Sequence, residues 1–357
     1  MPAGIERRRK MKKFPLMFFL FVIAAACLFF AVACKSSETV EKEGDEPKSA
    51  SQGLDYKLSS DESYYTLTGI GICMDEEIVI PSVFRGKSVK AIAEKALSDS
   101  SDVKKITVPD SVIKIGASAF ISCKELVEVR LPDSLTEIPE SCFRMCYKLE
   151  SVNIPSSLKK IGDMAFLSTA IKEIEIPDSV TKIGSSTFQY CSSLQRVVLP
   201  GSITEIPDQM FIDCNNLSDL VLPQGVKRIG FSSFSGCENL KKIVLPDTVE
   251  TIGVMAFDKC GIESIKIPDT VETIGGNVFS GCTKLKSVMI GNGVKCIKEG
   301  AFSGCSALSG VSFKNPTGWT AVLSDKTKQI PEGDLIYPGI AAEYLRSEYS
   351  LYCWQRV

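Results

Sequence analysis

The chain of 357 residues contains no histidine. This absence excludes a Ser-His-Asp triad, a Cys-His catalytic pair and histidine-ligated zinc. The sequence also lacks a Gly-x-x-x-x-Gly-Lys-Ser/Thr phosphate loop, and Gly69-Ile70-Gly71 lacks the third glycine of a dinucleotide site. None of its 14 cysteines forms a Cys-x-x-Cys pair. We therefore expect no enzyme, no cofactor and no metal site, and keep an enzyme only as a remote alternative.

Charge gives no indication of a nucleic-acid partner, because the net charge is only −2. Nor do the abundant carboxylates indicate catalysis, since Asp178, Asp247 and Asp269 occupy equivalent turn positions. The more informative regularity is a repeat.

Proline, phenylalanine and cysteine recur at fixed places every 22 or 23 residues. The segment 194–214, for example, contains Pro200, Phe211 and Cys214. A period of this length is typical of a solenoid, in which each unit packs only on its neighbours. The recurring phenylalanines are Phe120, Phe143, Phe166, Phe188, Phe211, Phe234, Phe257, Phe279 and Phe302. The sequence therefore predicts a column of stacked phenylalanines.

Each unit predicts three local structures. Val197 and Leu199 have the two-residue spacing of a short strand, which Pro200 ends because proline lacks an N–H. The Asp-Ser or Asp-Thr pair that often follows is expected to form a turn through side-chain bonds to nearby backbone. A second short extended segment comes next, and then Ala-Phe-x-x-Cys, which suits one helical or 3₁₀ turn.

The full pattern L-x-x-I-x-I-P-x-S-V-x-x-I-G-x-x-A-F-x-x-C resembles the BspA-like class of leucine-rich repeats over residues 81–313. The resemblance implies a leucine-rich-repeat-like stack of coils with short parallel strands. Because this class occurs in surface proteins of oral and intestinal microbes and of treponemes, it also implies adhesion to host matrix or to other microbes. Proline replaces the asparagine that follows the strand in better-known leucine-rich repeats.

The N-terminus is typical of a targeting segment. Basic residues at 7–13 precede the uncharged stretch 14–33, and Ala31-Val32-Ala33-Cys34 is similar to a bacterial lipoprotein processing site. The resemblance implies a signal peptide at 1–33, starting at Met1 or Met11, and a lipid on Cys34. The alternative is an uncleaved membrane anchor, since 20 apolar residues can span a bilayer. Both place the repeats outside the cytoplasm, tethered to the cell envelope.

The segments beside the repeats differ from them in composition. Residues 34–53 are polar and charged, which predicts a disordered tether. Residues 54–80 alternate like strands and are expected to form an N-terminal β cap. Residues 314–357 are expected to form a C-terminal cap, with a short helix over 340–354.

Eight cysteines follow the phenylalanines by three residues, which predicts that they point inward as small apolar side chains. They are Cys123, Cys146, Cys191, Cys214, Cys237, Cys260, Cys282 and Cys305. Cys73, Cys142, Cys296 and Cys353 lie outside this column and are better candidates for a bridge or a free thiol.

One outward position of each first strand carries consecutive valines in the middle coils. We expect Val198, Val221 and Val244 to form part of a partner site, with Met289 further along the same row. The parallel row of Arg196, Asp219 and Lys242 would orient the partner. In the plainer alternatives, valine simply favours strands and the charges keep the face soluble.

The leading interpretation is a lipid-anchored surface scaffold that binds a host-matrix or microbial protein or glycan. A spacer protein of the envelope without a dedicated ligand is the alternative.

Overall fold

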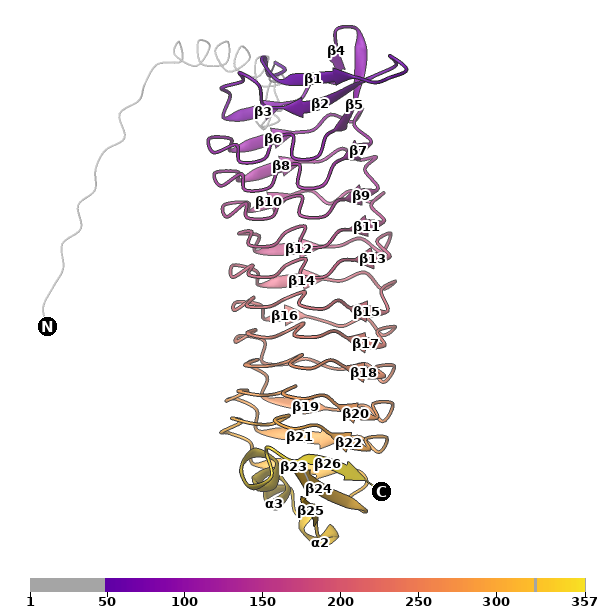
Figure 1. Cartoon of the computed structure of the whole chain (residues 1–357), viewed down its shortest axis with the longest axis vertical. Helices are drawn as coiled ribbons and strands as arrows, with labels where there is room; N and C mark the ends of the chain where they lie inside the picture. The colour runs from indigo at the N-terminus through magenta and orange to yellow at the C-terminus, as the bar shows by residue number, and fades with distance from the viewer. Residues whose placement is uncertain (1–48, 324–325, 357) are drawn as a thin grey trace, which may run out of the picture. The chain divides into compact units, whose positions relative to one another are not determined.

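The computed structural model describes residues 49–323 and 326–356, and the account below concerns these residues. The expected signal peptide, Cys34 and most of the tether lie outside them. Successive coils stack on one another, and two series of short strands run along the stack (Figure 1). The predicted solenoid of leucine-rich-repeat type is confirmed, since strands about one repeat apart pair in parallel.

The first series, which we call the first ladder, holds the strand that precedes each proline. It divides into three sheets, β3-β6-β8-β10, β12-β14-β16 and β19-β21-β23, and Lys242 bridges to Ser264 between the last two. Its strands are β3 (Glu77–Val79), β6 (Lys105–Thr107), β8 (Glu128–Arg130), β10 (Ser151–Val152), β12 (Glu173–Glu175), β14 (Arg196–Val198), β16 (Asp219–Leu220), β19 (Ser264–Lys266), β21 (Ser287–Ile290) and β23 (Gly310–Phe313).

The second ladder is the predicted second extended segment of each coil. Its isoleucines point into the core, as Ile206 and Ile229 do, and the preceding residue points out. Its strands are β5 (Lys87–Ile92), β7 (Lys114–Ile115), β9 (Glu137–Ile138), β11 (Lys160–Ile161), β13 (Lys182–Ile183), β15 (Glu205–Ile206), β17 (Arg228–Ile229), β18 (Thr251–Ile252), β20 (Thr273–Ile274) and β22 (Cys296–Ile297).

Other strands and helices lie at the two ends of the stack. Near the N-terminal end, β1 (Asp55–Leu58) pairs with β2 (Tyr65–Gly69), β2 pairs with β5, and β4 (Val83–Phe84) pairs with β5. At the other end, β26 (Cys353–Arg356) pairs antiparallel with β22 and with β24 (Trp319–Leu323), which pairs with β25 (Lys326–Gln329). The helices are α2 (Glu332–Leu335), α3 (Pro338–Glu343) and the π-helix η2 (Tyr344–Glu348). The helix expected over 340–354 is therefore shorter, because the chain from Cys353 onward joins a sheet.

The phenylalanine column is confirmed. All nine rings are buried, and neighbouring rings stack with centroids 5.2–5.8 Å apart and planes inclined by 6–19°. Leu97 fills the same buried place in the first coil. This column gives the coils a continuous core, which no single unit of 22 or 23 residues could bury alone.

The segment around each phenylalanine is a run of turns, and the expected helical or 3₁₀ turn does not form there. Gln209 and Asp213 on either side of Phe211 have φ of 60° and 55°, which a right-handed helix does not allow. Alternate N–H groups, those of Gln209, Phe211 and Asp213, donate to carbonyls of the next coil at 2.7–2.9 Å. Within the segment, backbone bonds from the N–H of residue i+3 to the carbonyl of residue i are isolated and do not continue into a helix. The bond from the Cys214 N–H to the Phe211 carbonyl, at 3.1 Å, is one of them.

The eight column cysteines are buried, as predicted, and they also satisfy backbone acceptors. The Cys214 thiol donates to the carbonyl of Phe188 in the preceding coil at 3.0 Å, and Cys191, Cys237 and Cys305 repeat this bond at 3.0–3.2 Å. Burial raises the pKa of Cys191 to about 11. A small side chain with a weak donor therefore suits this place.

Candidate functional site

The first ladder presents its polar and aliphatic outward side chains to solvent. Val221 is 76% exposed and Val244 is 64% exposed. Val198 is less accessible than these two, since its side chain is half-buried. Val197 and Leu220, their neighbours along the strands, point into the core. The alternation follows from strand geometry, in which successive side chains lie on opposite faces. The predicted row of outward valines is therefore present on the surface.

A hollow of about 270 Å³, which we call the middle groove, lies over β14 and β16. Its lining includes Arg196, Val198, Asp219 and Val221, four of the residues that the sequence singled out. The Arg196 Nε lies 3.1 Å from the Asp219 Oδ2, so these two charges pair with each other across neighbouring coils. Both side chains are exposed, and such a pair contributes little to stability.

A larger hollow of about 590 Å³, the C-terminal groove, lies further along the same face. Lys242, Val244 and Met289 line it, so the seven predicted partner-binding residues lie in one or other of the two grooves. Met289 is 42% exposed. The prediction of a partner site at these residues remains a prediction, but their location is one face of one ladder.

Small side chains open the C-terminal groove, and the sequence reasoning missed them. Ser264, Ser287 and Gly310 line it, at the repeat position that carries Arg196, Asp219 and Lys242 in the three preceding coils. Because two serines and a glycine stand here in place of long side chains, a hollow is left over the strands. The amino-acid sequence does show this feature, because small residues occupy the same place of the repeat in three consecutive coils.

One end of the C-terminal groove is formed from outside the repeats. Pro338, the first residue of α3, lines the groove and lies near Gly310 of β23. A Cβ at Gly310 would approach the Pro338 ring to 3.9 Å, which is ordinary contact. The packing of α3 on β23 is a tertiary contact that no repeat pattern announces.

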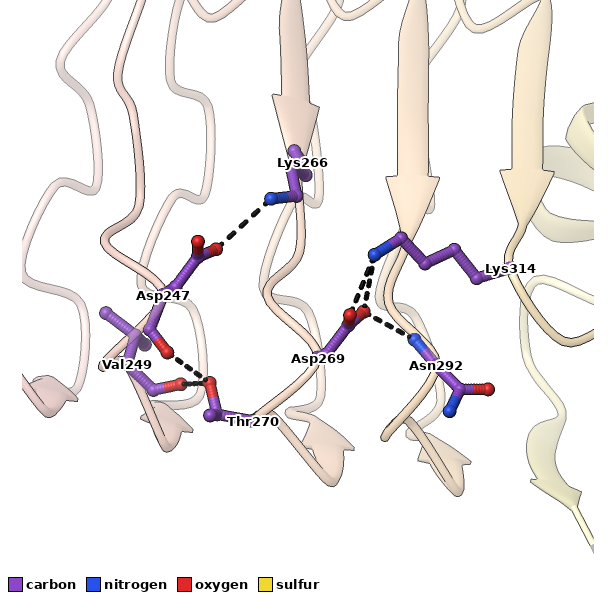
Figure 2. Close-up of polar contacts among 7 residues, drawn as sticks. All are labelled: Asp247, Val249, Lys266, Asp269, Thr270, Asn292 and Lys314. Carbon is purple, nitrogen blue, oxygen red and sulfur yellow. Dashed lines mark hydrogen bonds and ion pairs between the residues drawn. The ribbon is translucent and has the colours of Figure 1, made fainter.

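Charged side chains from different coils pair with each other (Figure 2), and of these Asp247 and Lys266 line the C-terminal groove. The Lys266 Nζ lies 3.1 Å from the Asp247 Oδ1, and the Lys314 Nζ lies 2.7 Å from the Asp269 Oδ2. Lys314 together with the Asn292 N–H, which donates to Asp269 at 2.8 Å, lowers the pKa of the Asp269 carboxyl. The C-terminal groove is therefore lined by both signs of charge, with Asp247 paired to Lys266.

In several Asp-Ser and Asp-Thr pairs the hydroxyl donates to the backbone of the preceding coil, and not to its own turn as expected. Ser111, Thr248 and Thr270 make such bonds. Figure 2 shows Thr270 donating to the carbonyls of Asp247 and Val249, at 3.0 and 2.5 Å. Ser202, which follows Gly201 and not an aspartate, likewise donates to the Val180 carbonyl at 2.5 Å. The stacked coil offers an open carbonyl at this place, so the hydroxyl joins two coils instead of tightening its own turn.

The part of the chain that the structure describes contains no group of three or more His, Cys, Asp or Glu side chains able to hold a metal ion. Among the same residues, no helix has the length and apolar character needed to cross a bilayer.

The sequence matches the model of the BspA type leucine-rich repeat region, in six copies, over residues 90–218 and 204–319. The structure is similar to that of a leucine-rich repeat protein from Bacteroides ovatus, with 30% identity and a TM-score of 0.68, covering 76% of this chain and 71% of that one. No curated protein matches the chain significantly.

Two further solved structures are similar over much of the chain. One is a leucine-rich cell surface protein from Faecalibacterium prausnitzii, with 24% identity, a TM-score of 0.43 and coverage of 76% of this chain and 96% of that one. The other is the T. pallidum leucine-rich repeat protein, with 24% identity, a TM-score of 0.32 and coverage of 73% and 90%.

Proposed function

This chain belongs to the BspA-type leucine-rich repeat family, and from that premise we propose that it is a non-enzymatic surface scaffold that binds a macromolecule along the outward face of its first ladder. The observation that carries the proposal is the clustering of exposed Val221, Val244 and Met289 in two grooves on one face. Exposed apolar groups in a hollow with a polar rim mark interaction sites.

The chemistry of the two grooves favours a protein partner on the host matrix or another microbe over a glycan. Their exposed floor is aliphatic, and burying it stabilises a complex by about 25 cal/mol per Å² of apolar surface. Paired charges such as Arg196 and Asp219 at the edge would set the orientation of the partner.

Binding is tested with cells that display the full-length chain on arrays of matrix proteins, microbial surface proteins and glycans. We expect retention on protein spots, and we expect the triple variant V198S/V221S/V244S to lose at least tenfold in binding. The matched control is I72S/I113S/V254S, which removes three exposed aliphatic side chains that line neither groove. Equal binding by both triple variants would refute the site, and absence of any ligand would favour the spacer alternative.

A second variant tests the C-terminal groove alone. Ser287→Lys would fill the groove. The repeat shows that the fold accepts this change, because Lys242 occupies the equivalent place two coils earlier, through its pairing with Ser264 and the pairing of Ser264 with Ser287. Ser151→Lys is the matched control, since Ser151 has the same repeat position in β10 outside both grooves. We expect only S287K to weaken binding; equal effects of the two variants would argue against this groove.

We also propose that a lipid on Cys34 tethers the protein to the cell envelope. The support is the sequence Ala31-Val32-Ala33-Cys34 after a basic and then an apolar segment. Cys34→Ser should abolish incorporation of labelled fatty acid and prevent signal removal. An uncleaved anchor would be identified instead if the wild-type chain stays in the membrane, takes up no labelled fatty acid and keeps residues 1–33.

A further inference from the structure

Two cysteines outside the buried column meet at the surface of the last coil. Cys296 and Cys353 are the described cysteines that are not buried, and their Sγ atoms lie 3.6 Å apart. The other described cysteines, including Cys73 and Cys142, are buried in the core. The two thiols are therefore both close together and accessible to solvent, whereas the column cysteines are buried.

The repeat gives no packing reason for a cysteine at position 296. This place of the second ladder faces outward. The first coil fills it with Ala91, and the later coils before Cys296 fill it with polar side chains. They are Lys114, Glu137, Lys160, Lys182, Glu205, Arg228, Thr251 and Thr273. Cys296 thus departs from the repeat at an outward, half-buried position in the last coil, which is the coil that contacts β26.

The pairing of β22 with β26 explains why the two thiols face each other. Ile297 lies opposite Trp354 in this antiparallel pair, and both side chains point into the core. Their neighbours Cys296 and Cys353 must then lie on the outer face of the sheet, because side chains alternate along each strand. The two sulfurs meet diagonally across the strand pair.

We propose that Cys296 and Cys353 form a disulfide that fastens the C-terminal segment, residues 314–356, to the last coil. The oxidant is an external disulfide, either of a thiol-disulfide oxidoreductase or of oxidised glutathione. One protein thiolate attacks the external disulfide, forms a mixed disulfide and releases one thiol. The second protein thiolate then attacks the protein sulfur of the mixed disulfide and releases the other thiol. Overall, the two protein thiols lose two protons and two electrons, and the external disulfide is reduced to two thiols.

The bond would close a loop across 57 positions of sequence. Cross-linking a loop of this size restricts the unfolded chain and so stabilises the segment that it holds. The loop includes α3, whose Pro338 lines the C-terminal groove. The disulfide would therefore hold in place the part of that groove that comes from outside the repeats, although its formation does not depend on any partner binding there.

The test uses the purified full-length chain, incubated with oxidised glutathione, blocked with iodoacetamide in denaturant and digested with trypsin. Cleavage after Lys295, Lys298, Arg346 and Arg356 yields peptides 296–298 and 347–356, each with a single cysteine. We expect these peptides to be linked, with the mass of two hydrogen atoms missing. Glutathione adducts or alkylated thiols at both cysteines, without a linked peptide, would overturn the proposal.

Thermal unfolding supplies a second measurement. Trp319 and Trp354 both lie in the C-terminal segment, so their fluorescence reports its melting. Oxidation should raise this transition by roughly 5–10 °C. The increase should be absent in C353S and retained in C73S, the matched control at a buried cysteine. An equal increase in C353S would refute the assignment, and the peptide map of the wild-type chain decides the question if C353S does not fold.

Discussion

The phenylalanine column predicts a large loss of stability from a single substitution in its middle. The Phe211 ring is completely buried between Phe188 and Phe234, with centroid distances of 5.8 and 5.5 Å. Truncating a buried phenylalanine to alanine costs about 3–5 kcal/mol, which includes the cavity left behind. Each stacked aromatic pair adds about 0.5–1.5 kcal/mol beyond burial. We therefore expect Phe211→Ala to lower the free energy of unfolding by about 4 kcal/mol or more.

Urea unfolding followed by far-ultraviolet circular dichroism measures this loss. With a urea dependence of roughly 3 kcal/mol per molar, the midpoint should fall by about 1 M or more. Phe231→Ala is the control, since Phe231 belongs to the next coil but is 42% exposed, and its midpoint should change little. Phe211→Leu should fall between the two, because leucine fills this place in the first coil as Leu97. Equal midpoints for F211A and F231A would refute the reasoning that the column holds the coils together.

Buried thiols should resist alkylation, because the core excludes iodoacetamide from them. The reagent also needs the thiolate, and burial raises the pKa of seven of the eight, that of Cys260 to about 12. Only burial protects Cys123, because its hydrogen bond with Cys146 lowers its pKa. At neutral pH we expect the eight column cysteines to stay unlabelled in the native protein and to label fully in urea; native labelling of all eight, measured by mass spectrometry, would contradict their inward orientation. Gly253→Ala should destabilise the protein by about 1–3 kcal/mol, since its Cβ would lie 2.6 Å from the Phe231 nitrogen. Gly333→Ala in α2 meets no atom within 4 Å and should be close to neutral in the same urea assay; comparable losses in both variants would exclude the clash as the cause.

The coil stack was predictable because one physical requirement repeats in every unit. Each phenylalanine, such as Phe188, must pack on its equivalent one period away, so spacing alone identifies the column. The inward orientation of Cys214 follows from the spacing in the same way. The backbone conformation of the turns around Phe211 does not follow from the spacing, because hydrogen bonds from alternate residues to the next coil hold Gln209 and Asp213 at positive φ.

The candidate site was predictable only where it follows the repeat. Val221 and Val244 lie outward because the strand alternates, and the sequence shows this directly. The depth of the C-terminal groove depends on Ser287 and on Pro338, which comes from a helix that docks through tertiary contacts. Motifs of large or charged side chains do not indicate this groove, because it is formed where such side chains are replaced by serine and glycine.

Departures from the repeat are therefore more informative about function than the repeat itself. A place that packs in every coil is explained by stacking, as the Phe and Cys columns are. Ser264, Ser287 and Gly310 replace long polar side chains at one outward place, and Cys296 replaces them at another. Stacking requires neither change, because both places face outward and most other coils fill them with charged side chains or threonine. Ser151 in β10 is an isolated small residue at the first place, and Ala91 in the first coil is one at the second. Since Cys296 and three consecutive small residues lie in the last coils, beside the C-terminal segment, we infer that this end of the solenoid carries functional features in addition to those of the middle groove.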